Sequence, residues 1–120
     1  MNSLRNNLFG ESVFTSFRTQ NSMVQGLRMH IERLYRDFAV CYGLEEVSYL
    51  EFCEEIINPL NLQEKMSANE NAYFRITIFS LEEAELKKTE FNLRKFQVDL
   101  MIKDLPASLS NEEVAQRVLE

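Results

Sequence analysis

Two stretches of this sequence alternate between apolar and polar residues, and they restrict the chain to folds that contain a sheet. The first stretch is Ala72–Ser80, in which Phe74, Ile76 and Ile78 share one side. In the second stretch the apolar residues are Phe96, Val98, Leu100 and Ile102. Successive side chains of a strand point to opposite faces, so each stretch predicts a strand with one buried face. The buried face must pack against helices, which the rest of the sequence has to supply.

The apolar spacing lengthens to three and four residues from Leu27 onward, which predicts an amphipathic helix. Gly43 followed by Leu44 predicts its end, because glycine readily adopts the left-handed conformation of a helix C-cap. We expect a second helix from Glu45 or Glu46 to Ile57, ended by Asn58-Pro59, since a residue before proline disfavours the helical conformation. Its predicted inward-facing residues are Val47, Leu50, Cys53, Ile56 and Ile57.

Shorter patterns complete the order of elements. Val13–Thr19 predicts a strand, Gln20–Ser22 a turn and Met23–Gly26 a returning strand. We expect Leu60–Asn71 to form an irregular loop with room for one helical turn, and Leu81–Glu90 to form a charged surface segment. Ser110 and Glu113 have the spacing of a capping box, which predicts a helix from about Asn111.

The predicted order is strand, strand, helix, helix, strand, strand, helix. It indicates an α+β fold, a mainly antiparallel sheet with two or three helices packed on one face. We assign residues 1–109 to one small α+β domain and residues 110–120 to the start of a helix or an interdomain linker. The last two residues, Leu119 and Glu120, are either native or a cloning scar.

Composition and charge argue against several functions. A net charge of −6 disfavours broad nucleic-acid binding, which needs clustered Lys and Arg side chains. No apolar run approaches the roughly 18 residues that a membrane-spanning helix needs, and no signal-peptide pattern is present, so we expect no membrane partner. Cys41 and Cys53 lie at helix positions that look buried and give neither a disulfide framework nor a zinc-ligand pattern, so we expect no metal and a reducing, cytoplasmic location.

His30 and Arg33 lie three residues apart and therefore share one helix face. An arginine near the start of a helix can hold a phosphate through its forked donors and the unpaired backbone N–H groups there. The other interpretation is a surface arginine and a histidine that caps a neighbouring loop, and the spacing alone favours it.

Tyr73 and Arg75 lie two residues apart on a strand and therefore share one face of the sheet. A phenol beside a guanidinium can fix a substrate carboxylate through paired hydrogen bonds. An edge strand with a solvated outer face explains the same pattern equally well. Since the chain has a single histidine, neither a Ser/His/Asp nor a Cys/His catalytic arrangement is supported.

Three motifs in order change this balance: G-E-S-V-F-T-S-F-R-T, then G-L-R-M-H-I-E-R-L-Y, then A-Y-F-R-I-T-I. Together they resemble the N-terminal domain of the class IV pyridoxal-phosphate aminotransferases, over about the first 80 residues. That family includes branched-chain aminotransferases, D-amino-acid aminotransferases and 4-amino-4-deoxychorismate lyases. Ser12, where glycine is usual, and Thr15, where glutamate is common, depart from the family pattern.

The resemblance implies roles for individual residues. Arg33 matches the arginine that binds the phosphate of pyridoxal 5'-phosphate, and Tyr73 with Arg75 match a pair that contacts the substrate carboxylate. His30 belongs to the motif as structural support for the helix, and Arg18 matches a basic position without an assigned role.

The resemblance also implies partners that lie outside these residues. In the family the Schiff-base lysine belongs to a second, C-terminal domain, and no lysine of this chain stands in a matching context. We therefore expect the N-terminal domain of an aminotransferase or aminodeoxychorismate lyase, inactive alone and a weak cofactor binder. It is either excised from its parent, which we favour, or a natural remnant. The parent would act on an amino-acid or aminodeoxychorismate-type substrate as a homodimer. The alternative is a non-catalytic interaction domain that retains the fold.

Overall fold

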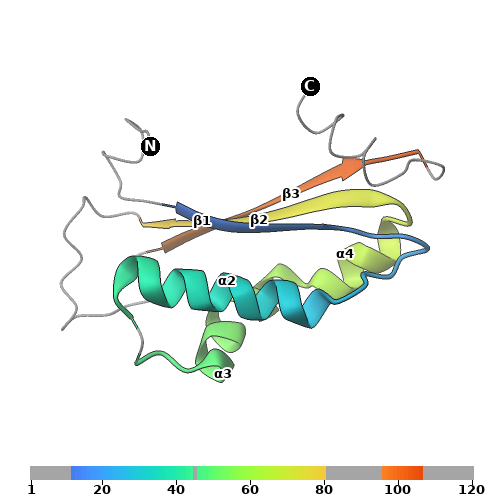
Figure 1. The fold of residues 1–120 in the computed structure, drawn as a ribbon. Coiled ribbons are helices and arrows are strands. Elements are labelled where there is room, and N and C mark those ends of the chain that lie inside the picture. The colour runs from blue at the N-terminus through green and yellow to red at the C-terminus, as the bar shows by residue number, and fades with distance from the viewer. Residues whose placement is uncertain (1–11, 45, 81–95, 107–120) are drawn as a thin grey trace.

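The computed structural model describes residues 12–44, 46–80 and 96–106. Three antiparallel strands form one sheet in the order β1-β2-β3: β1 is Ser12–Arg18, β2 is Ala72–Ser80 and β3 is Phe96–Asp104. The helices lie on one face of this sheet (Figure 1). The α+β prediction and the three long strands are therefore confirmed. The predicted Leu81–Glu90 surface segment, the helix from Asn111 and the assignment of residues 110–120 lie outside the described residues.

Strand register explains which side chains face the helices. Phe17 of β1 lies opposite Phe74 of β2, which in turn lies opposite Ile102 of β3. The helix-facing residues of β2 are fully or almost fully buried; they are Ala72, Phe74, Ile76, Ile78 and Ser80. The alternate residues of each strand make up the other side of the sheet, which we call the open face. On it Arg75 lies opposite Ser16 and Met101.

The predicted returning strand at Met23–Gly26 is wrong. Only one isolated bridge joins Gln20 to Met23, and β1 pairs with β2 instead. Asn21 and Ser22 both adopt positive φ, which makes the turn tight, and the helix begins at Leu27. The backbone N–H of Thr19 donates to the carbonyl of Ala72 at 2.8 Å, so the chain stays beside β2 to the end of β1.

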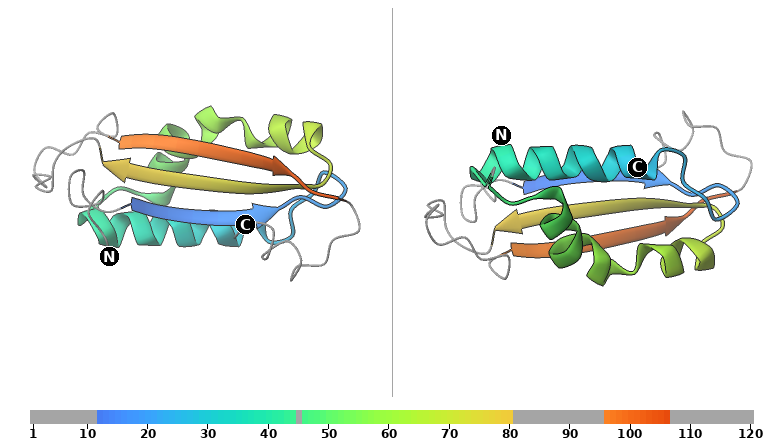
Figure 2. Two further views of the ribbon diagram at one scale, coloured as in Figure 1. Left: turned by 90° about the horizontal axis from the view of Figure 1, so that it is seen from above. Right: turned by 90° about the horizontal axis from the view of Figure 1, so that it is seen from below.

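Helix α2, Leu27–Tyr42, agrees with the prediction. Gly43 has φ 66° and caps the helix, and the N–H of Leu44 donates to the Ala39 carbonyl at 2.8 Å. This is the left-handed C-cap with a following apolar residue that Gly43-Leu44 predicts. The helix lies under β1, whereas α3 and α4 lie under β2 and β3 (Figure 2).

The second helix begins later than expected, at Tyr49. Helix α3, Tyr49–Phe52, has Ser48 as N-cap, whose hydroxyl accepts a hydrogen bond from the Glu51 N–H at 3.0 Å. A π-helical turn, Cys53–Ile57, ends where predicted, but the chain continues as a 3₁₀ turn over Asn58–Leu60. Proline is tolerated there because it stands in the first turn.

The later start changes which residues face the core. Leu50, predicted to face inward, is 67% exposed, whereas Phe52 is fully buried. Cys41 and Cys53 are only half-buried. The region Leu60–Asn71 is more regular than expected, because Leu62–Ala68 forms helix α4 with Leu62 and Met66 buried one turn apart.

Aromatic side chains join the two layers. The ring of Phe38 on α2 contacts Phe52 at 5.2 Å and Phe96 at 5.0 Å between centroids. Phe17 and Phe74 stack at 5.4 Å across β1 and β2. Aromatic pairs at these separations stabilise a core beyond the burial of their area. Phe38 thus joins α2 to α3 and to β3, and the Phe17–Phe74 pair joins β1 to β2.

Candidate functional site

His30 is tied to β1 on the helix-covered side of the sheet. Its ring lies 5.7 Å from the Phe17 ring between centroids, and its Nδ1 is 3.5 Å from the hydroxyl oxygen of the buried Thr15. The contacts reach across from the second turn of α2 to the edge strand of the sheet. His30 therefore fixes where the start of α2 lies on β1.

The environment of His30 favours its neutral form. Partial burial lowers the pKa of His30 below its ordinary value of 6.5, and the positive charge of Arg33 lowers it further. Burial and the neighbouring guanidinium therefore both disfavour a positive charge on the ring. An anion beside Arg33 would offset its positive charge and raise the pKa of His30.

Arg33 and Arg36 line one groove with the start of α2, which we call the α2 groove. This cavity of about 500 Å³ is bounded by Gln25, Gly26, Met29, His30, Glu32, Arg33 and Arg36. Both guanidinium-bearing side chains are exposed. Its volume falls within the range of roughly 300–1,000 Å³ that small ligands occupy.

The start of α2 leaves its first backbone N–H groups without a side-chain cap. Gly26 is the N-cap residue with φ 71°, and no acidic residue occupies the first turn. Glu32, the acidic residue that lines the groove, pairs with Arg28 at 2.9 Å. Arg33 lies about 9 Å along the helix from Leu27, given a rise of 1.5 Å per residue. The groove therefore combines two guanidinium groups with an uncapped helix start.

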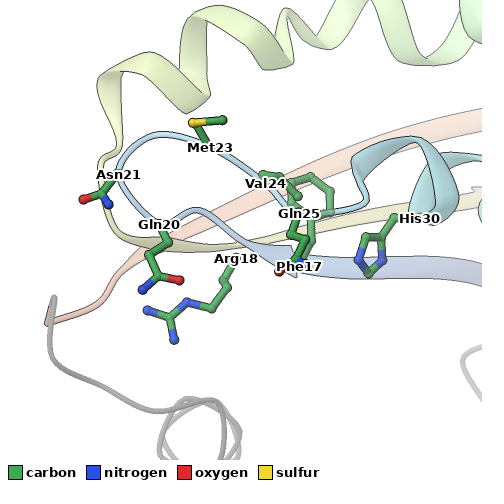
Figure 3. Close-up of a pocket in the computed structure, with 8 residues that line it drawn as sticks. All are labelled: Phe17, Arg18, Gln20, Asn21, Met23, Val24, Gln25 and His30. Carbon is green, nitrogen blue, oxygen red and sulfur yellow. The ribbon is translucent and has the colours of Figure 1, made fainter.

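A second hollow continues from the α2 groove around the end of β1. It has a volume of about 540 Å³, and Gln25 and His30 line both cavities. Figure 3 shows its lining side chains, which come from the end of β1, the following turn and α2; they are Phe17, Arg18, Gln20, Asn21, Met23, Val24, Gln25 and His30. Arg18 lies opposite Tyr73 in the register, so the hollow reaches from the helix layer toward the open face.

Tyr73 and Arg75 lie on the open face, on the opposite side of the sheet from α2. Tyr73 is buried, and the Cζ of Arg75 lies 4.1 Å from the centroid of the Phe14 ring. The structure thus brings His30 and Arg33 together and Tyr73 and Arg75 together, but it places the two pairs on different sides of β1.

Sequence reasoning missed Arg36 and Gln25 as groove residues and Phe14 as the partner of Arg75. The sequence could have placed Arg36 in the groove, since His30, Arg33 and Arg36 recur every three residues along one helix side. The sequence could not have predicted the contact of Phe14 with Arg75, because this contact depends on the register of β1 against β2.

The described residues form neither a metal site nor a disulfide. In residues 12–44, 46–80 and 96–106 no three His, Cys, Asp or Glu side chains gather to form a metal site. No disulfide joins Cys41 to Cys53. Among the helices of the described ranges, none has the length and apolar character needed to cross a bilayer. Comparison of the chain with known protein families and with curated proteins finds no match.

Proposed function

We propose that this chain is the N-terminal domain of a pyridoxal-phosphate-dependent enzyme of the class IV aminotransferase type. Its role is to anchor the cofactor phosphate with Arg33 and to supply Tyr73 and Arg75 for the substrate carboxylate. The ordered motifs support the family, and one structural observation supports the anchor: Arg33, Arg36 and the uncapped start of α2 line the same groove.

The groove has the chemistry that a phosphate dianion requires. A guanidinium presents a planar fork of N–H donors, and a helix start presents backbone N–H groups together with the positive end of the helix dipole. The carboxylate that lines the groove, that of Glu32, is already paired with Arg28, so it competes less for Arg33. Arg36 adds a second positive charge that sequence reasoning did not assign.

The two predicted pairs serve as separate subsites in this proposal. His30 and Arg33 belong to the helix layer, and Tyr73 and Arg75 belong to the open face. One pair would hold the phosphate end of the cofactor while the other would orient a carboxylate. Arg18, beside Tyr73 in the register and lining the hollow that contains His30, lies between them.

Pyridoxal 5'-phosphate, when bound, supplies an electron sink for chemistry at the α-carbon of an amino acid. The lysine that such an enzyme needs would come from a C-terminal domain of the same polypeptide, and the parent would be a cytoplasmic homodimer. Transamination and lyase chemistry are both compatible with the two subsites. The chain alone would be inactive and would bind the cofactor weakly, because half of its surroundings would be missing.

The phosphate anchor can be tested with pyridoxamine 5'-phosphate, which has no aldehyde and does not condense with lysines. We expect it to shift the amide signals of Gly26–Arg33 in a ¹H–¹⁵N NMR titration, with a dissociation constant on the order of 1 mM. Pyridoxamine, which lacks the phosphate, should leave these signals unchanged. Arg33→Gln should abolish the shifts because it removes the forked donor.

A matched control is Lys103→Gln, since it also removes one positive charge but lies on β3 and does not line the groove. This variant should bind pyridoxamine 5'-phosphate as the wild type does. If Arg33→Gln binds as well as Lys103→Gln, or if pyridoxamine and its phosphate give the same shifts, the anchor assignment is wrong. The non-catalytic interaction domain would then be the better interpretation.

A further inference from the structure

Arg75 and Phe14 make a cation–π contact across two strands of the open face. The Cζ of Arg75 lies 4.1 Å from the Phe14 ring centroid, well within the roughly 6 Å over which such contacts are attractive. Phe14 lies opposite Thr77, so Arg75 is its diagonal neighbour on the middle strand. The register of the two strands therefore places the Phe14 ring beside the side chain of Arg75.

The guanidinium of Arg75 keeps its hydrogen-bond donors available. Within the described ranges no hydrogen bond and no ion pair joins Arg75 to another residue. Asp99, the acidic residue diagonal to it on β3, accepts a hydrogen bond from the Gln97 side-chain amide at 2.9 Å instead. Stacking on the ring occupies one face of the guanidinium and leaves the N–H groups at its edge free to donate.

The surroundings of Arg75 combine these donors with apolar surface. Phe14 is 49% exposed and Met101, opposite Arg75, is 45% exposed. Large apolar side chains exposed beside a half-buried cation suit a ligand that carries both a carboxylate and an apolar group.

We propose that Phe14 is a positioning residue for Arg75: its ring holds the guanidinium in the orientation that receives a carboxylate of a small apolar acid. This inference rests on the proposed function, which assigns Arg75 to the substrate carboxylate. A free arginine side chain rotates among many rotamers and loses this freedom when it binds. Stacking on Phe14 restricts the side chain before the ligand arrives, so less freedom is lost on binding.

The test uses 4-methylpentanoate as the probe, with 4-methylpentanamide as its uncharged control. The Nε–Hε signal of Arg75 in a ¹H–¹⁵N NMR spectrum reports both stacking on the ring and binding of the carboxylate. We expect 4-methylpentanoate, and not the amide, to move this signal. Phe14→Leu should move the resting signal, through loss of the ring current, and weaken binding by about 3- to 10-fold.

Two further variants separate positioning from general effects. Phe14→Tyr keeps the ring and should retain both the resting signal and the affinity. Phe79→Leu removes a ring from the same face, where no cation–π contact with Arg75 is found in the described ranges, and should also change neither. Unchanged affinity in Phe14→Leu, equal loss in Phe79→Leu, or no response of the wild-type Arg75 signal to 4-methylpentanoate would each overturn the proposal.

The titration of the α2 groove with pyridoxamine 5'-phosphate follows the amide signals of Gly26–Arg33, on the other side of the sheet from Arg75. If those signals did not respond, the cofactor assignment would be wrong, but the measurements of stacking and carboxylate binding at Arg75 would still be valid. A failure at Arg75 alone would contradict the positioning role of Phe14 and leave the phosphate anchor standing.

Discussion

His30 links ionisation to the stability of the helix layer. Its pKa in the folded chain is lowered by partial burial and by Arg33, whereas in the unfolded chain it titrates near 6.5. Below this value the unfolded chain binds the proton more readily than the folded chain does. The contribution of His30 is therefore fully present above about pH 6.5 and is lost as the pH falls toward its folded pKa, below which the loss levels off.

The prediction is a difference between the wild type and His30→Gln, which does not titrate. Urea unfolding measured at intervals from about pH 8 to pH 5 should show the wild type losing stability relative to the variant as the pH falls. Carboxylates titrate in both proteins, so their effect cancels in the difference. Parallel curves for the two proteins would show that His30 keeps an ordinary pKa in the fold.

At the same scale, the contacts of Arg75 show what residue patterns can and cannot reveal. The two-residue spacing of Tyr73 and Arg75 correctly predicts that they share a face, because strand geometry enforces it. The stacking partner Phe14 stands some 60 residues away in sequence and meets Arg75 only through the pairing of β1 with β2. Local spacing contains no information about such a pairing.

At the scale of elements, helix α3 depends on a single side-chain cap. Ser48 accepts a hydrogen bond from the Glu51 N–H at 3.0 Å, and its backbone is extended, as an N-cap requires. Ser48→Ala should lower the free energy of unfolding by about 1 kcal/mol, the usual cost of losing such a cap. Chemical denaturation measures the change.

Ser48→Asp provides the matched comparison for this cap. An aspartate at the N-cap accepts the same hydrogen bond and also favours the positive end of the helix, so its stability should stay close to that of the wild type. If the alanine and aspartate variants lose the same stability, the cap does not contribute as described.

The elements also show why some predictions succeeded and others did not. Helix α2 was predictable because its apolar residues recur every three or four positions and a glycine follows its last residue. Both are local sequence signals, and the structure confirms both. Helix α3 was expected to begin at Glu45 or Glu46 because acidic residues suit a helix start, but the hydroxyl of Ser48 caps it. The prediction of a strand at Met23–Gly26 is wrong because β1 pairs with β2, which is distant in the sequence.

At the scale of the whole molecule, the sheet separates the two candidate sites. The helix side carries the α2 groove with Arg33 and Arg36, and the open face carries Arg75 on Phe14. The fold class can be predicted from the alternating strands, because their apolar faces require helices on one side of the sheet. The placement of Arg33 relative to Tyr73 and Arg75 cannot be predicted from the sequence, because it depends on how α2 crosses β1.

The central claim is that the α2 groove holds a phosphate beside Arg33, and the single histidine of the chain reports on it directly. The measurement is an NMR pH titration of the His30 ring with and without pyridoxamine 5'-phosphate. Because a phosphate dianion beside Arg33 offsets its positive charge, we expect the pKa of His30 to rise when the ligand binds, and not to rise with pyridoxamine. In Arg33→Gln the pKa should be raised already and should not respond to the ligand. A wild-type His30 pKa that stays the same at saturating pyridoxamine 5'-phosphate would contradict the claim.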